Sequence, residues 1–416
     1  MPVKRFRRPG PLPLRAWWER LRALLIPGWE RLRALLIPGW ERLRALLIPG
    51  LERLRALPVT RWWRSFPVLG RAGLAVVLVL GCTALLLDDG SPDQAAAQTA
   101  ASAAPADPSA APDDPAKPGT AATRSQLLSP PGTLFGIATP SAPNAEEAAN
   151  MAQITGVRTT VQEYFLKWHQ DFDQAAFDES YRLGGVPLLT WEPWSGGDKA
   201  VDQPEFALAK IAAGSQDDYV KRFAQAVKKS GRPVVLRFAH EMNEPWYTWS
   251  EDRNGNRKGD YVAAWRHVHD VFRQQGVTNV IWFWCPDLQS PGKPPLSRYY
   301  PGDDYVDWIG TEAYSSDGET TAEQLLGPTY RELTALSDKP LFIGEAGVRP
   351  SPVKAPLIKD FFSWLSAHPR VIGFVWFQFS DTDGSRYDWR FTTSPEAQRA
   401  FRDGLGSLPL VPGPMR

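Results

Sequence analysis

The sequence predicts an α/β fold, a (β/α)8 TIM barrel, preceded by a basic repeat segment, one transmembrane helix and a disordered linker. Two observations predict the barrel. Between Gln126 and Leu408, eight apolar, β-rich runs alternate with helix-like stretches, and strands that alternate with helices form parallel βα units. This segment of roughly 280 residues is also close to the ~250 residues that are typical of such a barrel.

The strand-like runs are short and rich in β-branched and aromatic residues. They lie at 133–139, 157–161, 186–191, 234–238, 280–284, 306–311, 341–344 and 374–379. The helix-like stretches between them lie at 145–154, 217–229, 261–274, 322–335, 357–367 and 395–405.

A basic segment precedes the barrel. The first 73 residues carry 16 Lys and Arg against four Glu, whereas residues 88–416 carry 31 Lys and Arg against 42 Asp and Glu. An 11-residue repeat begins at Trp18, Trp29 and Trp40, with a decaying copy from Leu51. Each unit predicts a short helix that Pro-Gly ends. These units either lie on the anionic inner leaflet of a membrane or are solvated and mostly disordered.

Residues 72–87 form a charge-free run of 16 residues between Arg71 and Asp88. A spanning helix needs about 20 residues, with a lower limit near 17, and apolar residues at 66–69 extend the run across Arg71, which can snorkel. The preceding Lys and Arg predict a cytoplasmic N-terminus. We expect a single-pass anchor in a bacterial plasma membrane, with the barrel outside. A lipoprotein signal around Cys82 and a buried helix are the alternatives.

An Ala- and Pro-rich stretch follows this run. Between Ser91 and Thr123 there are 13 Ala, six Pro and no aromatic residue, so the stretch cannot bury enough apolar surface to fold. The two cysteines, Cys82 and Cys285, predict no disulfide. The predicted organisation is a basic cytoplasmic segment at 1–71, an anchor at 72–87, a linker at 88–125, a barrel at 126–408 and a tail at 409–416.

Two glutamates follow the fourth and seventh strand-like runs, where a barrel carries its active site. Glu241 and Glu345 occupy these positions. A retaining glycosidase needs two such carboxyl groups, one as acid/base and one as nucleophile. Aromatic side chains with flat faces that suit stacking on sugar rings also fall at strand ends: Trp191, Trp194, Trp246, Tyr247, Trp249, Tyr314, Trp376 and Phe377.

The stretch His240-Glu-Met-Asn-Glu-Pro-Trp-Tyr-Thr-Trp249 resembles the His-Glu-Met-Asn-Gly-x-Trp-Tyr-Pro-Trp signature of glycoside hydrolase family 26, the β-mannanase and related β-glucanase group of retaining barrel enzymes. The similarity continues, in order, from Gly136 to Phe391. It includes Leu188-Leu-Thr-Trp-Glu-Pro-Trp194, Ile281-Trp-Phe-Trp-Cys-Pro286 and Asp304-Tyr-Val-Asp-Trp-Ile-Gly-Thr-Glu-Ala-Tyr314.

The resemblance implies a role for each matched residue. It implies that Glu241 is the acid/base, that Glu345 is the nucleophile, and that His240 orients the sugar and the nucleophile. It also implies that Tyr314 donates a hydrogen bond to the nucleophile and that Trp376 lies under the reacting sugar. The other predicted substrate-binding residues are Trp191, Trp246, Asn243 and Trp249.

Glu244 is a second candidate for the acid/base residue. Glu244-Pro245 replaces the usual Gly-x of the signature and creates an Asn-Glu-Pro tripeptide, which contains the acid/base in other families of the same clan. In that register Asn243 and Glu244 would take the catalytic roles. The downstream Trp-Tyr-x-Trp spacing matches only the first register, so we favour Glu241 and expect Glu244 at the rim.

No metal or cofactor is expected. The His-Glu-x-x-His motif of zinc proteases is absent because Glu244 takes its fifth position, and residues 252–260 miss the spacing of a calcium loop. Glu312, after the sixth run, is either a carboxylate that supports the site or a specificity contact.

The sequence therefore predicts a membrane-anchored retaining glycoside hydrolase that cleaves β-linkages of a polysaccharide. The simplest substrate is β-1,4-mannan, with mixed-linkage β-glucan and xylan as alternatives. Nucleic acid is not an expected partner, because the barrel segment is acidic. The competing hypothesis is a catalytically inactive, membrane-tethered module that binds or scaffolds glycan.

Overall fold

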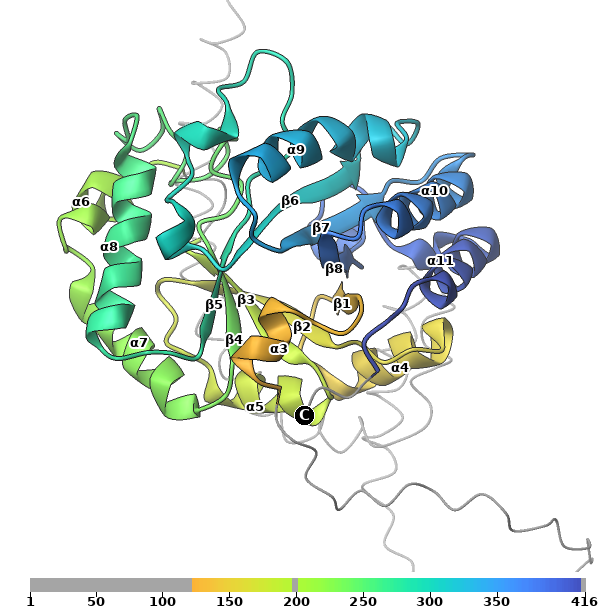
Figure 1. Cartoon of the computed structure of the whole chain (residues 1–416), viewed down its shortest axis with the longest axis horizontal. Coiled ribbons are helices and arrows are strands. Elements are labelled where there is room, and N and C mark those ends of the chain that lie inside the picture. The colour runs from red at the N-terminus through yellow and green to blue at the C-terminus, as the bar shows by residue number, and fades with distance from the viewer. Residues whose placement is uncertain (1–121, 197–200, 413–416) are drawn as a thin grey trace, which may run out of the picture. The chain divides into compact units, whose positions relative to one another are not determined.

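The computed structural model describes residues 122–196 and 201–412. In this part of the chain the strands close into one parallel barrel in the order β1 to β8, with helices around it (Figure 1). The prediction of an eight-stranded α/β barrel is therefore confirmed.

The predicted basic repeats, the predicted anchor and nearly all of the predicted linker lie outside the described residues. The first described helix, α3 (Arg124–Leu128), begins beside the predicted start of the barrel. Within the described ranges, the structure contains no helix with the length and apolar character required to cross a membrane.

Each strand pairs in parallel with its two neighbours in the chain, and β1 pairs with β8. The strands are β1 (Leu134–Ala138), β2 (Val161–Lys167), β3 (Val186–Glu192), β4 (Val234–Phe238), β5 (Val280–Trp284), β6 (Trp308–Ser315), β7 (Leu341–Val348) and β8 (Val371–Phe377). Strands β4 and β5 have the predicted bounds. Strand β2 starts where the second predicted run ends, so that prediction was wrong.

The α-helices follow the strands, as the alternation predicted. Besides α3 they are α4 (Ala145–Thr155), α5 (Gln174–Arg182), α6 (Leu208–Ala212), α7 (Asp217–Ser230), α8 (Asp260–Gln274), α9 (Ala322–Leu336), α10 (Lys354–Ala367) and α11 (Pro395–Ser407). Short 3-10 helices lie at Pro204–Phe206, Leu296–Arg298, Asp303–Tyr305, Asp381–Asp383 and Phe391–Thr393.

Side-chain caps set several helix starts. Asn144, Asp173, Thr321 and Ser394 each accept a hydrogen bond from a backbone N–H in the first turn of α4, α5, α9 and α11. Such caps satisfy donors that lack a partner inside the helix. The cap at Asp173 was a usable sequence signal for α5, which the apolar pattern did not reveal because most of that helix is polar.

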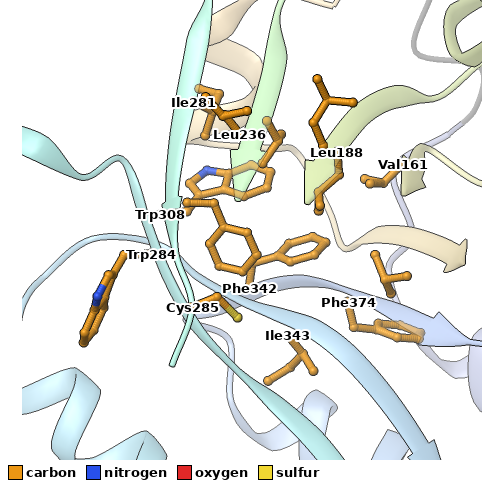
Figure 2. Close-up of a cluster of buried hydrophobic side chains, with 14 of the residues drawn as sticks. Val161, Leu188, Leu236, Ile281, Trp284, Cys285, Trp308, Phe342, Ile343 and Phe374 are labelled. Atoms are coloured by element: carbon orange, nitrogen blue, oxygen red, sulfur yellow. The ribbon is translucent and has the colours of Figure 1, made fainter. Parts of the chain in front are cut away.

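The core is built from side chains of the strands. Figure 2 shows a buried cluster to which strands β2 to β8 all contribute. Within it, the rings of Trp308 and Phe342 stack with centroids 5.0 Å apart. The indole N–H of Trp308 donates to the carbonyl of Leu127 at 3.1 Å. Helix α3, which contains Leu127, is thereby tied to the start of β6.

Candidate active site

The chain turns sharply after β4. Ala239 and Glu241 have φ values of 45° and 52°, in the left-handed region that residues other than glycine seldom adopt. Two backbone hydrogen bonds hold the turn: the Ala239 N–H donates to the carbonyl of Trp191 at 3.1 Å, and the Glu241 N–H donates to that of Cys285 at 2.9 Å. Strain of this kind persists only where its surroundings enforce it, and it concentrates at functional sites.

Glu241 is 9% exposed. Burial raises the pKa of its carboxyl group well above the usual range, and the negative charges of Asp287 and Glu345 raise it further. The indole N–H of Trp246 donates to Oε2 of Glu241 at 2.8 Å, which opposes this rise. Burial dominates, so the environment favours the protonated form of Glu241.

Glu345 has a different environment on strand β7. Its two carboxylate oxygens accept hydrogen bonds from the guanidinium of Arg237 and from the hydroxyl of Tyr314. The register of β7 against β8 shifts between Ile343 and Ala346, and bulges of this kind re-aim side chains. The two donors fix the position of the carboxyl group on β7.

Gly344 makes room for this arrangement. A Cβ atom at this position would lie 2.6 Å from Nη1 of Arg237 and 2.8 Å from Sγ of Cys285. Contacts under 3.0 Å are essentially never seen for real Cβ atoms. Only glycine therefore lets β7 pass over the Arg237 guanidinium.

Arg237 is fully buried and faces three glutamates from three strands. Its Nη1 lies 3.1 Å from Glu312 and 3.5 Å from Glu163, and its Nη2 pairs with Glu345. Burial raises the pKa of Glu163 to about 8 and that of Glu312 well above the usual range, although the Arg237 charge lowers both. Glu163 is thus largely protonated near neutral pH, and burial favours the protonated form of Glu312 as well, while Nη2 of Arg237 is paired with Glu345.

The Glu312 side chain lies in the interior of the barrel, in contact with Arg237 and Cys285, and is not exposed to solvent. It is fully buried, and its Oε1 lies 3.1 Å from both Arg237 and Sγ of Cys285. Of the two roles that the sequence left open, this burial excludes direct contact with a ligand.

His240 and Asn243 hold neighbouring parts of the site. His240 is 1% exposed, and its Nε2 forms a 3.1 Å hydrogen bond with the Tyr247 hydroxyl. Burial and the Arg237 charge lower the pKa of His240, so the ring is neutral. The Asn243 side chain donates to the carbonyl of Asp287 at 2.9 Å and accepts from its N–H at 2.8 Å.

The aromatic residues divide into two groups. Trp246 is 47% exposed beside Glu241, whereas Trp191, Trp249 and Trp376 have no exposed surface. A ring with no accessible face cannot stack on a sugar, so the prediction that these three bind substrate is corrected. Trp191 stacks on Phe223, Trp376 packs against Phe361 and Phe401, and the Trp249 indole donates to the carbonyl of His240.

Glu244 is committed to another partner. Its carboxylate forms an ion pair with the ammonium of Lys293, and its N–H donates to the carbonyl of Glu241 at 3.0 Å. The charge of Glu345 acts on the pKa of Glu241. This arrangement favours the register in which Glu241 is the partner of Glu345. Glu244 was expected at the rim, but its side chain is buried beside Lys293.

The sequence reasoning missed Arg237, Trp389 and Asp287. Arg237 was detectable as a lone cation inside an apolar strand, Val-Val-Leu-Arg-Phe, since a buried charge needs partners. The Trp389 ring lies 4.6 Å from that of Tyr314. It comes from the segment after β8, which carries no pattern that places it there. Asp287 is partly buried, and burial raises its pKa to about 6.

The structure is a closed parallel barrel with one buried glutamate just after β4 and another on β7. This combination is typical of barrel proteins of the glycosidase type. Residues 188–366 match the model of glycosyl hydrolase family 26. The sequence resemblance to family 26 is therefore confirmed.

Two known proteins are similar to this chain in amino-acid sequence. Endoglucanase H of Acetivibrio thermocellus is 30% identical over 280 residues, which are 64% of this chain and 29% of that protein. A mannan endo-1,4-beta-mannosidase of Bacillus subtilis is 30% identical over 145 residues, which are 34% of this chain and 35% of that protein. The chain thus spans about a third or less of the length of these relatives.

A solved structure supports the fold. The modular endo-beta-1,4-mannanase from Cellulomonas fimi superposes with a TM-score of 0.53 at 19% identity, covering 66% of this chain and 71% of that chain. At this identity the likeness concerns the fold alone.

The raised pKa of Glu163 makes stability depend on pH. Between pH 4.5 and about 8 the unfolded chain releases this proton while the folded chain keeps it, so the contribution of Glu163 to folding stability falls as pH rises. We expect the free energy of unfolding of the wild type, relative to Glu163→Gln, to decline across this window in urea titrations. Glu179, which pairs with Arg182 on helix α5, supplies the control: the free energy of unfolding of the wild type relative to Glu179→Gln should show no such decline. Parallel stability curves for wild type and Glu163→Gln would contradict the assignment.

Proposed function

We propose that the barrel is a retaining glycoside hydrolase that cleaves internal β-linkages of a neutral polysaccharide. The observation that carries the proposal is the contrast between two buried glutamates. Burial raises the pKa of Glu241 well above the usual range, whereas the Arg237 guanidinium and the Tyr314 hydroxyl donate hydrogen bonds to the two oxygens of Glu345. A retaining mechanism requires this division between an acid and a nucleophile.

In the proposed mechanism, Glu345 attacks the anomeric carbon while Glu241 gives its proton to the departing glycosidic oxygen. The bond to the leaving sugar breaks and a glycosyl-enzyme ester forms. Glu241, now a carboxylate, then takes a proton from water. That water attacks the anomeric carbon, releases Glu345 and retains the configuration.

The supporting residues have separate tasks in this mechanism. Trp246 holds the Glu241 carboxyl group through its indole N–H and keeps a large exposed surface for a sugar ring. Tyr314 holds Glu345, and Trp389 packs against Tyr314. His240, neutral and bonded to Tyr247, supplies a rigid wall next to Glu241.

The substrate we favour is β-1,4-mannan, followed by a related β-glucan and then xylan. The names of the relatives, an endoglucanase and a mannan endo-1,4-beta-mannosidase, support β-linked neutral glycans as a class. The charges of the site agree with a neutral substrate. Asp287, whose pKa is raised to about 6, adds a carboxyl group close to Glu241, and its negative charge near neutral pH would repel an anionic glycan.

We further propose that residues 72–87 anchor the chain in a bacterial plasma membrane with the barrel outside, where it trims glycan made by the same cell. The support for this proposal is the apolar run and the basic residues before it. Protease added to intact cells should release the barrel, and the N-terminal repeats should stay protected. An active barrel found free in the medium during growth would contradict the anchored model.

The roles of the glutamates can be separated by reducing-sugar release from β-mannans, β-glucans and xylans. Glu345→Gln and Glu241→Gln should each lower kcat by at least about 1,000-fold on the glycan that the wild type cleaves, because each removes an essential group. On an aryl glycoside, which needs no proton, formation of the glycosyl-enzyme should survive in Glu241→Gln. Glu244→Gln should keep most of its kcat. A folded wild-type protein that binds glycan and cleaves none would favour the binding-module hypothesis.

Tyr314→Phe isolates the hydrogen bond to Glu345. Loss of one hydrogen bond to a charged group costs about 1.5–3 kcal/mol, so kcat should fall roughly 10- to 100-fold with little change in KM. Tyr300→Phe is the matched control, since its hydroxyl donates to Asp303 outside the site. Equal losses in the two variants would show that Tyr314 contributes to folding alone.

A further inference from the structure

The segments after β4 and β5 are joined by two side-chain links beside Glu241. One is the paired hydrogen bond between Asn243 and the backbone of Asp287. The other is the ion pair between Glu244 and Lys293. The ammonium of Lys293 also donates to the carbonyl of Leu288 at 3.3 Å.

Both members of the ion pair lie close to Glu241. Glu244 belongs to the same turn, since its N–H donates to the carbonyl of Glu241 at 3.0 Å. Burial lowers the pKa of Lys293, and the nearby carboxyl group of Glu241 opposes this shift. Glu345, in contrast, is held by Arg237 and Tyr314. The ion pair therefore sits with the proposed proton donor.

The exposure of the two side chains differs. The Glu244 side chain is 7% exposed and that of Lys293 is 27% exposed. An ammonium group has three N–H donors. Glu244 and Leu288 accept two of them within the part of the chain that the structure describes, so one donor remains for a ligand at the exposed side.

We propose that the Glu244–Lys293 ion pair lines the leaving-group side of the site, where Lys293 donates a hydrogen bond to a hydroxyl of the departing sugar. This inference rests on the proposed hydrolase function, in which Glu241 protonates the oxygen of that sugar. Lys293 is then a specificity-determining residue and Glu244 is the positioning residue that holds its ammonium. The exposed ring of Trp246, also bonded to Glu241, provides a flat face on the same side.

The proposal also explains a departure in the sequence. Residue 244 is where the chain replaces the Gly of the family signature. A glycine there would leave the Lys293 ammonium without its carboxylate partner. Glu244 and Lys293 therefore act as a pair that depends on the folded arrangement of two loops 49 residues apart in sequence.

The test compares two leaving groups on the full chain. The probes are mannopentaose, which releases a sugar, and 4-nitrophenyl β-mannobioside, which releases a phenol without sugar hydroxyls; cello-oligosaccharide counterparts replace them if the enzyme cleaves glucan. In Lys293→Met, the ratio of kcat/KM for the oligosaccharide over that for the aryl glycoside should fall about tenfold. Glu244→Gln should lower this ratio by a smaller factor, and Lys293→Arg should restore part of it.

Lys221→Met is the matched control, because Lys221 pairs with Asp217 on helix α7 outside the site. Its ratio should equal that of the wild type. A ratio that stays at the wild-type value in Lys293→Met would overturn the proposal, whether kcat/KM falls equally on both probes or does not fall at all.

A binding measurement separates this proposal from the hydrolase function. In a Glu345→Gln background, calorimetry with mannopentaose or cellopentaose should show about tenfold weaker binding when Lys293→Met is added. If the wild type cleaves neither probe, the proposed hydrolase activity fails, and the binding result still decides the role of Lys293. Unchanged affinity would overturn that role.

Discussion

The buried guanidinium of Arg237 is the interaction on which the site depends. An isolated charge in a protein interior is costly unless it is paired and hydrogen-bonded, and Arg237 meets three glutamates from strands β2, β6 and β7. One positive charge cannot offset three negative charges, so burial keeps Glu163 and Glu312 largely protonated. The network therefore fixes the position of Glu345 and supplies its counter-charge.

The two central glutamates differ because their strands end differently. Strand β7 carries Glu345 over the guanidinium, where Gly344 removes the Cβ that would collide with it. Strand β4 ends in a strained turn that directs Glu241 toward Trp246 and the neighbourhood of Asp287. Backbone geometry thus sets the two environments: Glu345 accepts from Arg237 and Tyr314, whereas Glu241 accepts from Trp246 and lies near the carboxyl group of Asp287.

Trp191, Trp249 and Trp376 were predicted to bind substrate but are buried. The position of a residue near a strand end does not by itself tell which face of the strand its side chain occupies. Successive side chains point to opposite faces of a strand, so an error of one residue exchanges the core and the site. Trp376 packs against Phe361 of helix α10, while its neighbour Phe377 lies 5.8 Å from the ring of Tyr314. The phase of this alternation follows from pairing with neighbouring strands, which a run of consecutive aromatics does not reveal.

The sequence by itself determined the eightfold alternation, the bounds of β4 and β5, and the placement of Glu241 just after the fourth strand and of Glu345 with the seventh. These features are local, since apolar runs, helix periodicity and strand order are written in consecutive residues. It missed the start of β2 because that strand contains Glu163, which is buried only where Arg237 and Thr190 meet it. Tertiary structure alone decided the raised pKa of Glu163, the exposure of Trp246 and the pairing of Lys293 with Glu244. Each of these features depends on residues that the fold brings together from distant parts of the sequence.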